Sequence, residues 1–149
     1  LDIEALYNRG VLKLEMNDRV GAQKDFEVAA KHGEYSPYGL LGNALIHRLN
    51  EEWEEAEKIY TSILNEYPQM TDIYLKRAEC YLHMGQLSKL SSDLQAVAST
   101  EFANPTFYFL RGQLRLEQYD KVAAKDDFER AKELGMDSEV LQPWIEKTK

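Results

Sequence analysis

The sequence predicts an all-α protein built from stacked helical hairpins. Two observations support this fold class: motifs recur with a fixed period of 34, and the apolar residues within each copy follow helical spacing rather than strand alternation. One motif begins at Arg9 and recurs at Arg111, and a second spans residues 25–29 and recurs at 127–131. Both offsets are 102, which is three periods of 34.

Intermediate copies appear where this period places them. Three columns of residues with steps of 34 run through four copies. They are Ala22, Ala56, Leu90 and Ala124; Phe26, Tyr60, Leu94 and Phe128; and Ala29, Ile63, Val97 and Ala131. Each copy of such a repeat buries its apolar face only against its neighbours, so four copies predict a solenoid.

Each copy is expected to contain two helices with recognisable ends. Asp18 and Asp120 are placed as N-caps of second helices. Gly33 and Gly135 suit the left-handed residue that closes a helix, and Pro68 ends the second helix of the second copy. The repeats therefore run over about 3–34, 35–68, 69–102 and 103–136, within a single domain over 1–149.

The second repeat departs from the even spacing in this interpretation. The small residues assigned to the first helices are Gly10, Gly42, Ala78 and Gly112, so the successive steps are 32, 36 and 34. Two residues are then missing before Gly42 and two are added after it. The turn near Asn50-Glu51-Glu52 is therefore expected to be longer than the other turns.

A small residue on the first helix, followed by a small and then a large residue on the second, as in Ala22 and Phe26, resembles the tetratricopeptide repeat (TPR) family. The resemblance covers nearly the whole chain, with residues 138–149 as a capping helix. It implies a right-handed α-α superhelix whose first helices line a concave groove that holds a partner's peptide or helix. The resemblance also allows for further repeats in a parent chain.

The groove columns that the resemblance implies are largely apolar. The expected peptide-binding residues are Tyr7, Asn8, Val11, Leu40, Asn43, Leu75, Lys76, Glu79, Phe109, Leu110 and Gln113. Four further residues could lie in the groove or pack inward: Leu14, Ile46, Leu82 and Leu116. Burial of such side chains against a partner helix would stabilise a complex.

The family's carboxylate clamp, which grips acidic chaperone tails with Lys, Asn and Arg, is expected to be absent. Its columns hold Tyr7, Val11, Leu40, Asp72 and Lys76 in the first three repeats, and Gly39, Asn43, Lys76, Thr106 and Leu110 in the last three. A partner with an apolar or mixed peptide is therefore preferred.

Arginine and aspartate change together across the repeats. Structural ion pairs are predicted for Arg9 with Asp25, Arg77 with Asp93, and Arg111 with Asp127. The second repeat lacks both members, and Leu41 and Ile59 are taken as their apolar replacement. The alternative is that the three arginines form an anion site.

Composition excludes several classes of function. The net charge of −8 disfavours nucleic acid as a partner, and no apolar run reaches the ~18 residues of a membrane span. We find no catalytic triad order, phosphate loop or metal-ligand spacing, so no enzyme activity, cofactor or metal is expected. Cys80, Trp53 and Trp144 are interpreted as packing residues.

The sequence predicts a module that binds another protein, but it leaves two alternatives. One is a structural spacer within a longer repeat array, suggested by apolar Leu1, Ile3 and Leu6, and the other is a regulatory arm of a larger enzyme. The chain begins without an initiator Met and is interpreted as a trimmed fragment or a processed chain. A single cysteine is more typical of a cytosolic than of a secreted protein, and the compartment stays open.

Overall fold

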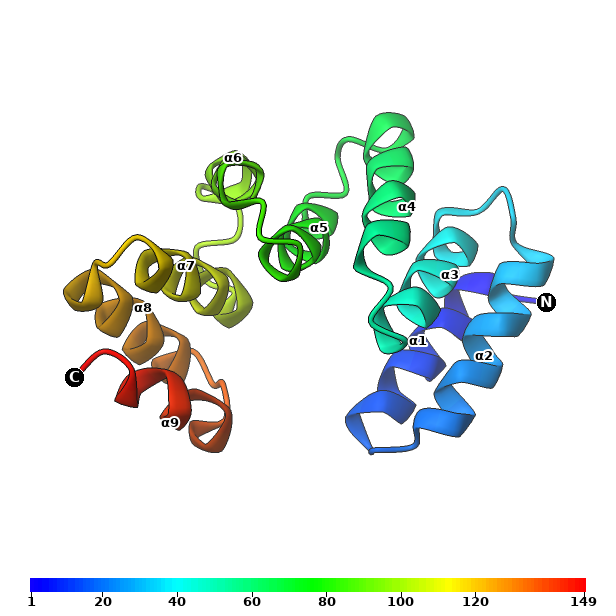
Figure 1. Cartoon of the computed structure of the whole chain (residues 1–149). Coiled ribbons are helices and arrows are strands. Elements are labelled where there is room, and N and C mark those ends of the chain that lie inside the picture. Colours follow the sequence, from blue (N-terminus) through cyan, green and yellow to red (C-terminus); the bar gives the residue numbers. More distant parts are fainter. The chain divides into compact units, whose positions relative to one another are not determined.

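The computed structural model describes residues 1–149, which form nine α-helices and no β-strand (Figure 1). The chain divides into two compact units, Leu1–Gln69 and Met70–Lys149. The first unit contains α1 (Ile3–Glu15), α2 (Arg19–His32), α3 (Pro37–Leu49) and α4 (Trp53–Glu66). The second contains α5 (Asp72–His83), α6 (Leu87–Val97), α7 (Pro105–Glu117), α8 (Lys121–Glu133) and α9 (Ser138–Glu146). Four helical hairpins are therefore present, followed by a short ninth helix.

The turn inside each hairpin has the same backbone conformation in all four copies. Three residues separate each first helix from its second helix. The middle residues have positive φ angles: Asn17 (62°), Glu51 (58°), Gly85 (72°) and Tyr119 (62°). The N–H of the next residue bonds to a carbonyl five residues earlier, as from Asp18 to Lys13, which closes the helix in the Schellman manner. The expected longer turn at Asn50-Glu51-Glu52 is wrong.

The small residues on the first helices also keep the period of 34. The column consists of Gly10, Ala44, Ala78 and Gly112. A Cβ atom at Gly10 would lie 2.5 Å from Cε1 of Phe26, and one at Gly112 would lie 2.6 Å from Cε1 of Phe128, so each ring fills the space beside its glycine. A Cβ at Gly42 would instead lie 3.1 Å from the carbonyl oxygen of Phe26, at the contact between α2 and α3. The predicted place of Gly42 in this column is wrong, and no insertion is needed.

This register also changes the interpretation of the second repeat. The position that holds arginine in the other repeats is Asn43, one full period after Arg9, and not Leu41. Leu41 is buried, whereas Asn43 is exposed. The second repeat therefore replaces the ion pair by Asn43 and Ile59, and Leu41 is a core residue.

The helix caps agree with the prediction in part. The Oδ1 atom of Asp18 accepts the backbone N–H of Gly21 at 2.9 Å, and Oδ1 of Asp120 accepts that of Ala123 at 3.1 Å. Gly135 has a φ of 106°, which suits glycine. Gly33 has a φ of −122°, so the left-handed prediction is wrong there.

Gly33 is required for a different reason. A Cβ atom at this position would lie 2.6 Å from the side chain of Ile3 and 2.8 Å from the carbonyl oxygen of Ala29. The residue is buried between the start of α1 and the end of α2. Close packing, and not backbone conformation, therefore selects glycine at residue 33.

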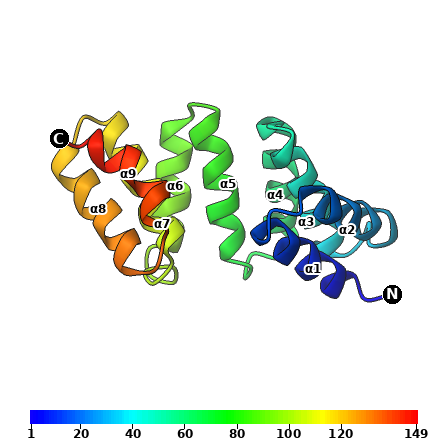
Figure 2. The same cartoon turned by 90° about the horizontal axis from the view of Figure 1, so that it is seen from below.

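Each unit has its own buried core. In the first unit Phe26 and Tyr60 are fully buried. In the second unit Leu94 and Phe107 belong to one cluster formed by α5, α6 and α7. A further cluster joins Phe128 of α8 to the ninth helix, which lies against α8 (Figure 2). None of the helices combines the length and the apolar composition that a membrane span requires.

Candidate functional site

Four of the predicted groove residues are buried in the free chain. The exposed fractions are 7% for Tyr7, 4% for Leu75, 2% for Leu110 and 8% for Gln113. The expectation that these side chains form an exposed apolar stripe is wrong. The physical reason is that the first helices pack against one another as well as against their second helices, as α1 does on α3 and α5 on α7.

Tyr7 illustrates this packing between neighbouring hairpins. Its ring centroid lies 5.9 Å from that of Phe26 in the same hairpin and 5.9 Å from that of Tyr38 on α3. Such tilted aromatic pairs stabilise the contact beyond the area that they bury. Tyr7 therefore joins the two hairpins of the first unit.

Phe109 has the same role at the end of the second unit. It follows Leu75 by one repeat period, and its ring centroid is 6.0 Å from that of Trp144 and 6.3 Å from that of Phe128. Phe109 is only half-buried, but the ninth helix covers part of its surface. The prediction that Trp144 is a packing residue is confirmed by these contacts.

The remaining predicted groove residues keep accessible surface and are mostly polar. Asn8 and Asn43 are exposed, and four others are half-buried: Val11, Leu40, Lys76 and Glu79. Asn8 and Asn43 lie on α1 and α3, which contact each other within the first unit. Lys76 and Glu79 lie on α5 of the second unit. Among these six residues the two exposed side chains are amides, and the four half-buried ones are two apolar and two charged side chains.

The structure contains ion pairs at the three predicted Arg–Asp positions, each joining a first helix to its second helix. The Nη2 to Oδ1 distances are 2.7 Å for Arg9 and Asp25, 2.6 Å for Arg77 and Asp93, and 2.9 Å for Arg111 and Asp127. In each pair Nε also donates to the carboxylate, so the contact is bidentate. The three aspartates are buried, and these arginines therefore have a structural partner.

Sequence reasoning missed a second cation in two of these pairs. Lys13 Nζ lies 3.0 Å from Asp25 Oδ2, and Arg115 Nη1 lies 2.8 Å from Asp127 Oδ2. Lys13 and Arg115 are separated by the same offset of 102 and lie one helical turn after the first cation of each pair. That recurrence is the signal that would have found them. Two cations then share one carboxylate in the first and fourth repeats.

These contacts shift the acid–base properties of the paired groups. The hydrogen bond from Arg9 is the main reason why the pKa of Asp25 is lowered to about 2, with a smaller contribution from Lys13, while burial acts in the opposite direction. The hydrogen bond to Asp127 likewise raises the pKa of Arg111. The Arg9–Asp25 pair is therefore ionised over the physiological pH range.

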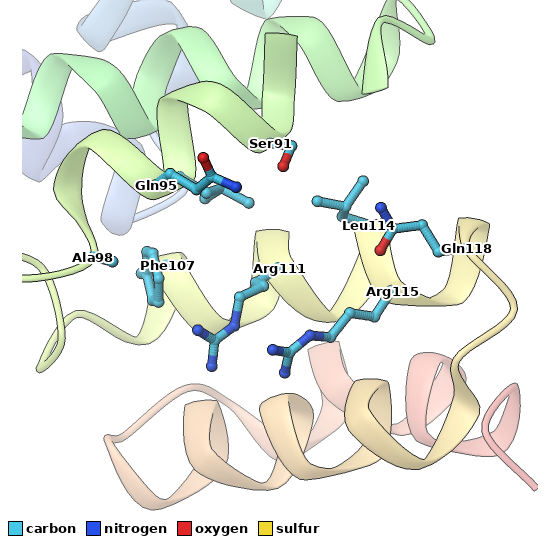
Figure 3. Close-up of a pocket in the computed structure, with 9 residues that line it drawn as sticks. Ser91, Gln95, Ala98, Phe107, Arg111, Leu114, Arg115 and Gln118 are labelled. Atoms are coloured by element: carbon cyan, nitrogen blue, oxygen red, sulfur yellow. The ribbon is translucent and has the colours of Figure 1, made fainter. Parts of the chain in front are cut away.

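The second unit has a recess between α6 and α7. Its volume is about 250 Å³. The lining residues are Ser91, Leu94, Gln95, Ala98, Phe107, Arg111, Leu114, Arg115 and Gln118. Figure 3 shows Ser91 and Gln95 on one wall and the side chains of Arg111 and Arg115, which extend from α7 toward α8, on the other side.

Side chains that could carry metal or thiol chemistry are not gathered at any site. The structure has no group of three or more His, Cys, Asp or Glu residues that could hold a metal ion. Cys80 is fully buried, which agrees with its predicted packing role.

Comparisons with known proteins agree with the architecture. A family model described as tetratricopeptide repeat matches residues 40–69. A tetratricopeptide repeat protein from Parabacteroides merdae is 30% identical with a TM-score of 0.81, and the match covers 98% of this chain and 57% of that chain. The chain thus spans less than two thirds of that relative.

Two further solved structures share the fold at lower identity. A TPR protein of Thermus thermophilus is 16% identical with a TM-score of 0.80, covering 99% of this chain and 81% of that chain. The Yersinia enterocolitica type III secretion chaperone SycD, in complex with a peptide of the translocator YopD, is 17% identical with a TM-score of 0.63, covering 73% and 88%.

Four helical hairpins with a common turn and a common small-residue column define an all-α helical repeat protein. By this fold, and by the repeat recognised at residues 40–69, the chain is a tetratricopeptide-repeat protein.

Proposed function

We propose that this chain is a protein-interaction module that binds an extended or helical segment of a partner on the accessible surface of its first helices. The observation that carries the proposal is that Asn8 on α1 and Asn43 on α3 are exposed amides on two contacting helices; Asn43 lies in the arginine column of the repeats, one residue after Gly42, which is the repeat equivalent of Asn8. An amide side chain both donates and accepts hydrogen bonds, which suits the backbone of an extended peptide. The fold supports this use, since SycD has the same fold and was crystallised with a peptide.

Because several of the predicted groove residues are buried in the free chain, the proposed peptide-binding surface contains fewer residues than the sequence predicts. In the first unit the proposed surface consists of Asn8, Val11, Leu40 and Asn43, and a separate accessible patch on α5 of the second unit carries Lys76 and Glu79. Tyr7, Leu75, Leu110 and Gln113 are left out of this surface because they are buried in the free chain, and Phe109 is left out because its ring packs on Trp144 of the ninth helix. Binding to this surface is expected to depend on hydrogen bonds more than on apolar burial.

The proposed surface has no carboxylate clamp. Its clamp positions in the first three repeats include Asp72, and Lys76 is the one cation among them. An acidic peptide end would therefore meet a negative charge as well as a positive one. Amidation of a bound peptide's C-terminus is expected to leave its affinity for this surface unchanged.

The test uses peptides selected from a random 12-residue library on the purified chain. We expect the double variant Asn8→Ala, Asn43→Ala to weaken binding about ten-fold, since each lost hydrogen bond is worth about 0.5–1.5 kcal/mol. Asn65→Ala is the matched control, because Asn65 is an exposed amide on the second helix α4. Equal affinities of the double variant and the control, measured by fluorescence anisotropy, would contradict the proposal.

A structural spacer within a longer repeat array is the second candidate function. Leu12 is 57% exposed, whereas Leu114, at the same repeat position, is 5% exposed in the cluster that includes Leu94 of α6. A preceding second helix would cover Leu12 in the same way. Hydroxyl-radical footprinting of the parent protein tests this: protection of Leu12 and the exposed Met16, relative to the present chain, supports a spacer. Equal labelling excludes it. No feature of the structure favours a regulatory arm.

A further inference from the structure

The recess between α6 and α7 has a positively charged lining, although the chain as a whole is negatively charged. The whole sequence has a net charge of −8, yet the lining of the recess contains two arginines and no acidic side chain. The lining comes from α6, the segment after it and α7. It contains none of the residues assigned above to the first-helix surface.

The arginines are only partly neutralised by their own carboxylate. Arg111 makes a bidentate contact with Asp127, and Arg115 reaches the same carboxylate through Nη1 alone. Two positive charges therefore face one negative charge. Both arginine side chains are 31% exposed, whereas that of Asp127 is 3% exposed. An incoming anion would meet the cations and not the buried carboxylate.

Arg115 has the free donors that a ligand needs. Its one hydrogen bond in the structure leaves Nε and Nη2 without a protein acceptor. Arg111 is more constrained, because its guanidinium also lies over the rings of Phe107 at 5.0 Å and Tyr108 at 5.3 Å. Arg115 is thus the residue that would pair with a carboxylate.

The floor of the recess is apolar and its rim is polar. Leu94, Phe107 and Leu114 are each at most 5% exposed and belong to the core of the second unit. Ser91 on α6 and Gln118 at the end of α7 provide hydroxyl and amide groups at the edge (Figure 3). A volume of about 250 Å³ is below the roughly 300–1,000 Å³ of most ligand pockets. It suits one or two side chains of a peptide rather than a cofactor.

We propose that this recess is a second peptide-binding site, which takes an acidic side chain next to an apolar one from a partner protein. The carboxylate of Asp or Glu pairs with Arg115, and the neighbouring Leu, Ile or Phe lies against Leu94 and Leu114. The rim residues hydrogen-bond to the peptide backbone. The site therefore recognises a short acidic–apolar motif, independently of the peptide's C-terminus.

The probe is the blocked peptide acetyl-Gly-Glu-Leu-Gly-amide, titrated into the isotope-labelled chain and followed by NMR. We expect the shift changes to concentrate on the backbone amides of Ser91, Gln95 and Gln118 and on the Nε–H of Arg115. The matched peptide with Gln in place of Glu should bind at least about five-fold more weakly, since a charge-assisted hydrogen bond is roughly twice as strong as a neutral one. Equal binding of the two peptides would overturn the proposal.

Two variants with the same change in charge distinguish binding at this recess from general electrostatic attraction of the acidic peptide to the chain. Arg115→Gln should weaken the acidic peptide at least about five-fold, whereas Lys125→Gln, at an exposed position of α8, should leave its affinity unchanged. Asp127 keeps its Arg111 partner in the first variant, so the fold is preserved. Equal effects of both variants, or shifts spread over the surface, would refute the site. The Asn8 and Asn43 variants should not affect this peptide, so the two proposals fail separately.

Discussion

Removal of the two cations around Asp127 should destabilise the second unit in a strongly non-additive way. Arg111→Met is expected to lower the free energy of unfolding by about 1–2 kcal/mol, because Arg115 still pairs with the carboxylate at 2.8 Å. Arg115→Met should cost about 1 kcal/mol, since the bidentate contact with Arg111 remains. The double variant should cost about 3–5 kcal/mol, because a carboxylate that is 3% exposed is then buried without a cation.

The second repeat indicates how the loss can be reversed. Its residue at the aspartate position is Ile59, and its residue at the arginine position is Asn43. Asp127→Ile in the double-cation variant should therefore recover most of the lost stability, since no buried charge remains.

Urea unfolding provides the measurement. In a Trp53→Phe background Trp144 is the remaining tryptophan, and its ring lies 6.2 Å from that of Phe128, so its fluorescence reports the second unit. A complete cycle of single and double variants gives the coupling energy between the two cations. Additive losses, or a failure of Asp127→Ile to restore stability, would refute the argument that burial of the unpaired carboxylate dominates.

Four further outcomes follow from the geometry. Tyr119→Gly should raise the free energy of unfolding by about 0.5–1 kcal/mol, because the tyrosine is 93% exposed and its φ is 62°; a lower urea midpoint would contradict this. Gly112→Ala should cost about 1–3 kcal/mol, since the new Cβ would lie 2.6 Å from the ring of Phe128, and unchanged thermal unfolding would refute it. Leu75→Ala should cost about 2–4 kcal/mol, because this side chain is 4% exposed, and a neutral effect would place it outside the core. The pKa of Asp25 is lowered to about 2, so its contribution of roughly 1–2 kcal/mol to the free energy of unfolding is present above pH 5 and lost as the pH falls toward 2. The difference in unfolding free energy between the unchanged chain and Asp25→Asn should therefore shrink over that pH range.

The repeat period could be predicted because it is written directly in local sequence. Motifs offset by 102 and helical spacing of apolar residues predicted the hairpins, and Asp18 and Asp120 were identified as caps from their residue type and position. The Arg–Asp pairs could also be predicted from the sequence, since Asp25, Asp93 and Asp127 occur in the same repeats as their arginines and are absent together from the second repeat.

In the second repeat the wrong residue was assigned to the small-residue column because glycine was preferred to alanine. Gly42 matches Gly10 and Gly112 in residue type, whereas Ala44 matches them in the period of 34 and is fully buried. The turn residues show the even register, because Glu51 adopts the same positive φ as Gly85. A left-handed conformation imposed on glutamate by the repeat cannot be recognised from its residue type, which does not favour that conformation.

The accessible surface was decided by tertiary structure. The sequence determined which residues lie on the first helices, but it did not determine which of them face a neighbouring helix. Tyr7 packs on Tyr38 of the next hairpin, and Phe109 packs on Trp144 of the ninth helix.

By itself the sequence determined the helical hairpins, their caps and the paired charges, because each depends on residues within one repeat. The tertiary structure decided that the apolar columns are core, that Asn8 and Asn43 remain accessible, and that Arg115 borders a recess beside α6. The physical reason is that burial depends on the helices that pack from adjacent hairpins, and a side chain's own sequence position does not specify that contact.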